Sequence, residues 1–164
     1  MPIIIGIDPS LRSTGYGIIR VEGRETHSLA FGVIKNHDKI VPSRCLVSIH
    51  QQITDLLQQY RPDAAAVEGS IYLQNYKTAI TLGSARGAAL LALAEAGLPI
   101  YEYAPRRVKA AATGHGAAQK AQVGFMMRAL LGLTENPPPD AADALALALT
   151  HAQNTGLRTR PKEI

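Results

Sequence analysis

Five apolar segments of the chain have the length and composition of β-strands. The first, residues 3–7, is a nearly continuous run of isoleucine, which is typical of a buried central strand. The next two strands are joined by a short turn and should form an antiparallel meander with the first. The last two each follow a helical pattern, which favours parallel strands. These four later strands are predicted at residues 15–21, 27–35, 63–68 and 98–103.

Elsewhere the apolar residues recur at helical spacing. The clearest case begins at Pro42 and ends at Arg61-Pro62, and its apolar face holds Leu46, Ile49, Ile53, Leu56 and Leu57. The remaining helical segments are predicted at residues 78–96 with Gly97 as cap, a short turn at 106–111, 118–131 and 140–151. The order of elements predicts an α/β fold, with a five-stranded mixed sheet and helices on both faces.

Two acidic residues open the last predicted helix. Three prolines, 137–139, precede Asp140 and Asp143, which lie three residues apart and therefore on one face. Two carboxylates this close repel each other, and a divalent cation is the usual neutralising partner. Alternatively, Asp140 is a helix N-cap and Asp143 a first-turn acid favoured by the helix dipole. The stretch alone leaves both interpretations open.

Two further acids sit where strands end. Asp8 closes the first strand and Glu68 the fourth, and burying an unpaired carboxylate beside an apolar run is costly. Ligands of open α/β sheets bind beyond the carboxyl ends of the strands, so parallel neighbours would bring both acids to one edge. With Asp140 and Asp143 they would offer four oxygen donors, which suit Mg²⁺ or Mn²⁺ rather than Zn²⁺. Two such ions about 4 Å apart would serve phosphodiester cleavage.

Composition limits the class of protein. A chain of 164 residues with 46% hydrophobic content predicts one domain, residues 1–153, followed by a flexible basic tail, 154–164. The net charge of +4 favours a polyanionic partner. The single cysteine, Cys45, fits a reducing compartment and is expected to be a small buried hydrophobe. With no apolar run of membrane-spanning length, and with Asp8 too early for a signal peptide, we expect a cytoplasmic protein.

Five segments carry a family resemblance over the chain to about His151. In order, they are Gly6-Ile7-Asp8-Pro9-Ser10-Leu11-Arg12-Ser13-Thr14-Gly15-Tyr16-Gly17, Ala66-Val67-Glu68, Leu82-Gly83-Ser84-Ala85-Arg86-Gly87, residues 114–123, and Pro139-Asp140-Ala141-Ala142-Asp143-Ala144-Leu145-Ala146. Together they resemble the RuvC-type Holliday-junction resolvases of the RNase H-like superfamily. The resemblance implies metal ligands at Asp8, Glu68, Asp140 and Asp143, and two Mg²⁺ ions per site, with Mn²⁺ as a substitute.

The same resemblance implies an activity and partners. It predicts a homodimer that resolves four-way DNA junctions in recombination and repair by paired symmetric nicks, leaving 5′-phosphate and 3′-hydroxyl ends. It also predicts a complex with branch-migration motor proteins. Lys109 and Lys120 match family lysines near the active site. The other basic candidates for phosphate contact are Arg12, Arg106 and Arg107, while Arg86 is either a weaker DNA contact or an ion-pair partner at a dimer or core edge.

The segment after Glu68 departs from the family pattern. The family usually has an aromatic base-contacting residue at position 71, where this chain has Ile71 with Tyr72 beside it. Either side chain is predicted to contact bases, Tyr72 by stacking or Ile71 as an apolar wedge. Ser10 stands where the family commonly has glycine. His115 is interpreted as a surface residue without a catalytic role, and the alanines of residues 85–96 indicate a close helix–helix surface.

Two other classes of protein remain in competition. Asp8-Pro9-Ser10-Leu11-Arg12-Ser13-Thr14-Gly15 also resembles the first phosphate loop of actin-like ATPases and sugar kinases. Those enzymes need two such domains and a glycine-rich adenosine motif, which 164 residues do not supply. A non-catalytic nucleic-acid-binding module is disfavoured because four acids would repel phosphate.

Overall fold

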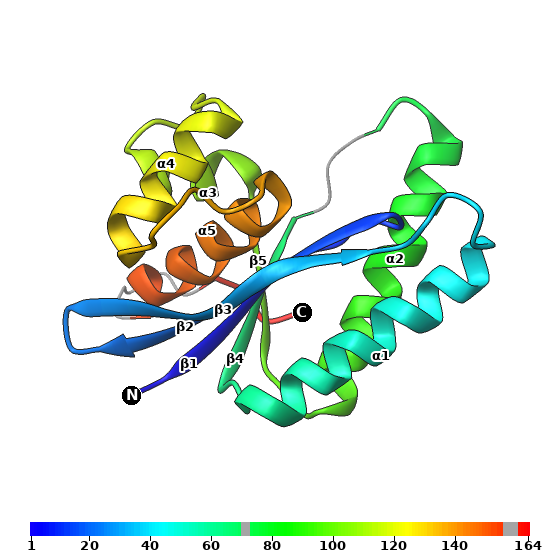
Figure 1. Ribbon diagram of the computed structural model, residues 1–164, viewed down its shortest axis with the longest axis horizontal. Coiled ribbons are helices and arrows are strands. Elements are labelled where there is room, and N and C mark those ends of the chain that lie inside the picture. The colour runs from blue at the N-terminus through cyan, green and yellow to red at the C-terminus, as the bar shows by residue number, and fades with distance from the viewer. Residues whose placement is uncertain (70–72, 156–160) are drawn as a thin grey trace.

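A five-stranded sheet forms the centre of the molecule in the computed structural model, which describes residues 1–69, 73–155 and 161–164. The strand order is β3-β2-β1-β4-β5, with β1 between an antiparallel and a parallel neighbour (Figure 1). This confirms the predicted mixed sheet. It also meets the condition under which Asp8 and Glu68 share one edge, because the first and fourth strands are parallel neighbours. The strands are β1 Ile3–Asp8, β2 Ser13–Glu22, β3 Glu25–Lys35, β4 Ala64–Glu68 and β5 Ile100–Tyr103.

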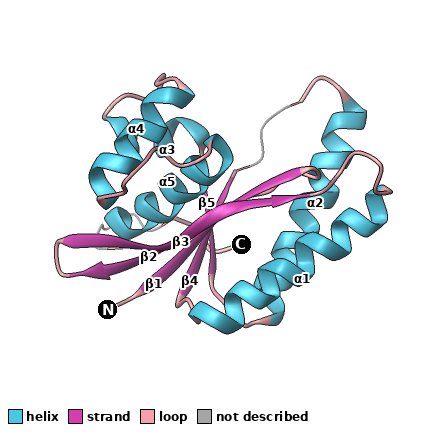
Figure 2. Ribbon diagram, in the orientation of Figure 1, coloured by secondary structure: helices cyan, strands magenta, loops and turns pink. Residues whose placement is uncertain are grey.

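Helices cover both faces of the sheet, as predicted. Two of them pack on one face and three on the other, so that the sheet is the middle of three layers (Figure 2). One core lies under α1 and α2 and includes Ile5, Ile7, Ile49 and Leu93. The second lies under the other helices and includes Leu145. The helices are α1 Pro42–Tyr60, α2 Tyr76–Glu95, α3 Pro105–Thr113, α4 Lys120–Leu131 and α5 Pro139–Asn154.

Helix α5 lies unusually close to the sheet because glycines face it. A Cβ atom built on Gly6 would lie 1.9 Å from the carbonyl oxygen of Ala144, so only glycine permits this approach. The residues of α5 from Ala141 to Leu149 are buried, apart from the half-buried Asp143. Since α5 is fixed on β1 and β2, its first turn has a defined position relative to the carboxyl end of β1.

The helix α3 differs from the sequence prediction of a short turn. It runs for nine residues, with Pro105 in its first turn and Gly114 as a left-handed C-cap at φ 77°. Proline at a helix start and glycine after its end are both favoured, so the full helix is consistent with local sequence preferences.

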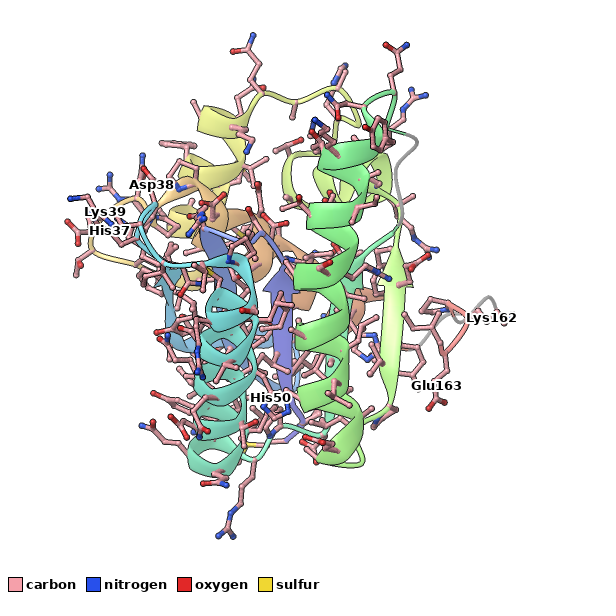
Figure 3. All side chains as sticks on the ribbon, turned by 90° about the vertical axis from the view of Figure 1, so that its right-hand side faces the viewer. His37, Asp38, Lys39, His50, Lys162 and Glu163 are labelled. Atoms are coloured by element: carbon pink, nitrogen blue, oxygen red, sulfur yellow. The ribbon has the colours of Figure 1, made fainter. Side chains whose placement is uncertain are left out.

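The last described residues of the chain lie against the sheet. Glu163 forms an antiparallel bridge with Tyr101, and the backbone N–H of Ile164 donates to the carbonyl of Ile100. Figure 3 shows Lys162 and Glu163 beside β5. Pro161–Ile164 therefore lie along the outer edge of the sheet. Among the described residues, no helix has both the length and the apolar character needed to span a membrane.

Candidate active site

Three aspartates from two elements meet at the carboxyl end of β1. Asp8 is the last residue of that strand, and the first turn of α5 brings Asp140 and Asp143 over it. One carboxylate oxygen of each lies within 4.8 Å of the others, and all three residues are half-buried. The structure therefore brings together three of the four predicted ligands at cation-binding distance.

Glu68 approaches the same cluster from the neighbouring strand. The parallel register pairs Ile7 with Val67, so Asp8 and Glu68 are the next residues at one edge of the sheet. Glu68 lies outside the tightest group of three. Its charge nevertheless raises the pKa of Asp8, and only burial raises that pKa more. All four predicted acids thus share one electrostatic site.

The acids raise one another's proton affinity. Burial, followed by the charges of Glu68, Asp143 and Asp140, raises the pKa of Asp8 from 3.8 to about 7. Burial and the neighbouring carboxylates also raise the pKa of Glu68 and of Asp143. A group of oxygen donors held in this costly arrangement fits a hard divalent cation, which relieves the repulsion.

The helix-cap interpretation of Asp140 is wrong. The N-cap of α5 is Pro138, which makes no side-chain capping bond, and Asp140 lies inside the first turn. Its carboxylate instead accepts a 2.5 Å hydrogen bond from the hydroxyl of Ser13. The three prolines fix where the helix begins, and the carboxylate of Asp140 reaches across to β2 rather than back onto the helix end.

Two lysines flank the acids, as the sequence predicted. The ammonium of Lys120, in the first turn of α4, lies 3.6 Å from a carboxylate oxygen of Asp143. The positive charge of Lys109 on α3 partly offsets the rise in the pKa of Glu68 and of Asp143. Lys109 and Lys120 therefore place positive charge beside the acidic cluster.

Two of the three arginines predicted to contact DNA have other partners. The guanidinium of Arg12 donates to the carbonyls of His37 and Ile40, in the loop labelled in Figure 3. Arg107 donates to Asn154 and lies 5.6 Å from the Tyr103 ring centre. These contacts give both side chains a structural role.

Arg106 packs beside the loop at Gly116. The DNA contacts expected of these three arginines stay predictions. Ile71 and Tyr72 lie outside the described residues. His115 is exposed, and its ring accepts a backbone N–H from the same loop, as expected of a surface residue.

A cleft opens beside Asp8 and Glu68 and has α2 as its far wall. It measures about 190 Å³ and is lined in part by Leu82, Gly83 and Arg86. Arg86 donates one 2.5 Å hydrogen bond to the carbonyl of Glu68 and another to the carboxylate of Glu102. The ion-pair interpretation of Arg86 is therefore confirmed, but at the β4–β5 edge, where the pair fixes the backbone that carries Glu68.

A model of the family described as Crossover junction endodeoxyribonuclease RuvC matches residues 4–151. The chain belongs to this family. A RuvC protein of Akkermansia muciniphila is 48% identical over 148 residues, covering 90% of this chain and 89% of that protein. A RuvC protein of Coxiella burnetii is 48% identical over 155 residues, covering 94% and 90%.

Solved structures agree with the RuvC assignment. The structure titled T. thermophilus RuvC in complex with Holliday junction substrate has a TM-score of 0.86 at 40% identity, covering 93% of both chains. The yeast mitochondrial Holliday junction resolvase Ydc2 has a TM-score of 0.59 at 12% identity, covering 90% of this chain and 77% of its own, and shares the fold. The RNase H-like fold expected from the sequence is therefore confirmed.

Proposed function

We propose that this chain is a structure-selective endonuclease that resolves four-way DNA junctions by paired, symmetric hydrolytic nicks. The observation that carries the proposal is the convergence of Asp8, Asp140 and Asp143 within 4.8 Å at the sheet edge, with Glu68 on the adjoining strand. The family membership and the junction bound by the T. thermophilus relative support the choice of substrate.

The four acids fit divalent metal. We propose Asp8, Glu68, Asp140 and Asp143 as ligands for two Mg²⁺ ions, with Mn²⁺ as a substitute. Bound Mg²⁺ would activate a water nucleophile and stabilise the leaving 3′ oxygen of an in-line displacement, which yields 5′-phosphate and 3′-hydroxyl ends. Asp8, with its pKa at about 7, must lose its proton for a cation to bind, so metal binding and deprotonation are coupled.

The neighbouring cations would hold the DNA backbone. Lys109 and Lys120 lie beside acids that would otherwise repel phosphate, and they are suited to fix the scissile strand over the cluster. The cleft along α2, between Glu68 and Leu82, gives the strand a path away from the acids. Ile71 and Tyr72, proposed to contact bases, follow Glu68 by three and four residues in the sequence.

A homodimer follows from the symmetry of the proposed substrate, because the described residues of one chain form one acidic cluster and a junction needs two nicks. We propose the outer face of α2 with α1 as the dimer surface. Ile80, Val47 and Leu91 expose 65%, 57% and 53% of their surface there, respectively. Not all of the alanines expected to form a helix–helix surface are free to do so. Ala85, Ala89 and Ala92 are buried in the core of the same chain, under α1 and α2.

The dimer surface is testable by one charge. Leu91→Asp places a carboxylate on an exposed helix position, so it should dissociate the dimer while leaving the fold intact. Light scattering after size-exclusion chromatography reports the mass. A wild-type chain that is monomeric at micromolar concentration contradicts the proposed dimer. By family resemblance alone, the proposal extends to a complex with branch-migration motor proteins.

The activity is tested by mapping cuts in a mobile synthetic junction with each strand labelled in turn. With Mg²⁺, the wild type should cut two opposite strands at symmetric positions, and DNA ligase should reseal the products without further treatment. Asp8→Asn should bind the junction and leave it intact. A wild type that binds but never cuts would refute the proposed reaction and favour a binding module. Products that ligase cannot join would refute the proposed 5′-phosphate and 3′-hydroxyl ends.

A further inference from the structure

The first half of β2 carries almost no side chain on the side that faces α5. Side chains alternate between the two faces of a strand, so residues 13, 15 and 17 lie on this side, and two of them are glycine. A Cβ atom on Gly15 would lie 1.9 Å from the carbonyl oxygen of Asp140, and one on Gly17 would lie 2.7 Å from the backbone nitrogen of Leu145. The third position, Ser13, therefore places a lone hydroxyl at the end of a surface otherwise emptied for the helix.

That hydroxyl holds one of the acids. The Ser13 Oγ atom donates to Oδ2 of Asp140 at 2.5 Å, a length typical of a charge-assisted hydrogen bond to a carboxylate. The two residues are 127 positions apart in sequence, so the contact forms only when α5 has docked on β2. Ser13 and Asp140 are both half-buried, which limits competition from water.

The bond opposes a repulsion. Asp140 shares a space of 4.8 Å with two other carboxylates, and its side chain would turn away from them if nothing restrained it. A hydroxyl restrains the carboxylate without bringing a positive charge that competes with a cation. It also uses a single lone pair of Asp140 and leaves the others for a ligand.

We propose that Ser13 is a positioning residue for divalent metal, acting through Asp140. The inference rests on the proposed function, because it names a partner for one of the proposed metal ligands. Ser13 orients the carboxylate before the cation arrives, so that less freedom is lost on binding. Outer partners of metal ligands typically change metal affinity by about 10–100-fold when they are removed.

The test compares Ser13→Ala with Ser13→Thr, which keeps a hydroxyl and suits a strand. Mg²⁺ and Mn²⁺ are titrated against the thermal unfolding midpoint of the full chain, and Mg²⁺ against junction cleavage. Ser13→Ala should need about tenfold more metal for half of either effect, with cleavage recovering at saturation. Ser13→Thr should follow the wild type. Ser28→Ala, a matched change in β3 near the opposite end of the sheet, should do the same.

Two outcomes overturn the inference while leaving the proposed function intact. One is a Ser13→Ala variant whose metal titrations match those of the wild type. The other is a cleavage defect that persists at saturating metal with an unchanged metal requirement, which marks a purely structural role. If Ser13→Ala does not fold, Ser13→Cys, which keeps the shape of the side chain but is a weak donor, must show the weakened metal titration. A wild type that neither binds Mg²⁺ nor cuts overturns the proposed function itself.

Discussion

Replacing Asp8 by asparagine should stabilise the metal-free protein while abolishing its proposed activity. Asp8 has a pKa of about 7 in the folded chain against 3.8 as the reference value, so the folded state binds its proton more tightly. Well below pH 3.8 the carboxyl is protonated in both states and does not lower the stability. As the pH rises towards 7 the unfolded chain ionises first, and stability is lost until the folded carboxyl ionises too.

The size of the effect follows from the shift in pKa. A rise of three pKa units corresponds to about 4 kcal/mol of lost stability above pH 7, since each unit is worth about 1.4 kcal/mol. Relaxation of the cluster and counterions reduce this, and we expect about 2 kcal/mol for Asp8→Asn near pH 8. For a domain of this length that is about 4–8 °C in melting temperature.

The assay is urea unfolding followed by circular dichroism near pH 8, first with a chelator and then with Mg²⁺. Asp38→Asn is the matched control, since it removes the same charge from the exposed loop labelled in Figure 3. The control should change stability by less than about 0.5 kcal/mol. Mg²⁺ should stabilise the wild type and narrow its gap to Asp8→Asn.

The overall charge of the protein favours the opposite change in stability, so the prediction distinguishes the local cluster from general electrostatics. The chain has a net charge of +4, so loss of a carboxylate makes it more positive and slightly less stable through general repulsion. A gain in stability can therefore come only from the local cluster. If Asp8→Asn is no more stable than Asp38→Asn in chelator, the account of mutual repulsion is refuted.

Two further predictions concern the surroundings of the acids. Gly15→Ala puts a methyl group 1.9 Å from the carbonyl oxygen of Asp140, so it should shift α5, cost about 2–4 kcal/mol in urea unfolding and abolish Mg²⁺ stabilisation. Gly83→Ala meets open space in a helix and should not be destabilising; equal losses in both variants would contradict the close-approach argument. Lys120→Ala removes the ammonium 3.6 Å from Asp143 and should weaken junction binding and lower its logarithmic salt slope by about one, as measured by titrations at several salt concentrations; an unchanged slope would exclude a phosphate contact.

The acidic cluster was predictable because each acid sits at a position that local sequence marks. Asp8 and Glu68 follow apolar strands, and Asp140 follows prolines that must precede a helix. The parallel pairing of β1 with β4 then follows from the helix between the meander and the fourth strand. What remained was the docking of α5, and the family resemblance supplied it.

The partners of the polar side chains could not be predicted in the same way. Ser13 meets Asp140 only through the docking of α5 on a face emptied by Gly15, and Arg12 meets carbonyls 25 and 28 residues away. Such contacts depend on tertiary packing rather than on local pattern. The alternation of serine and glycine at positions 13, 15 and 17 was the available signal for a face that receives a helix.

The most direct test of the central claim is the cleavage rate of a mobile four-way junction by the wild type and by Asp8→Asn, at equal junction occupancy and over a Mg²⁺ titration. The account predicts that wild-type cleavage rises with Mg²⁺ from none in chelator, and that Asp8→Asn remains bound and inactive at every Mg²⁺ concentration. Cleavage by Asp8→Asn at the wild-type rate, or wild-type cleavage that persists in chelator, would contradict it.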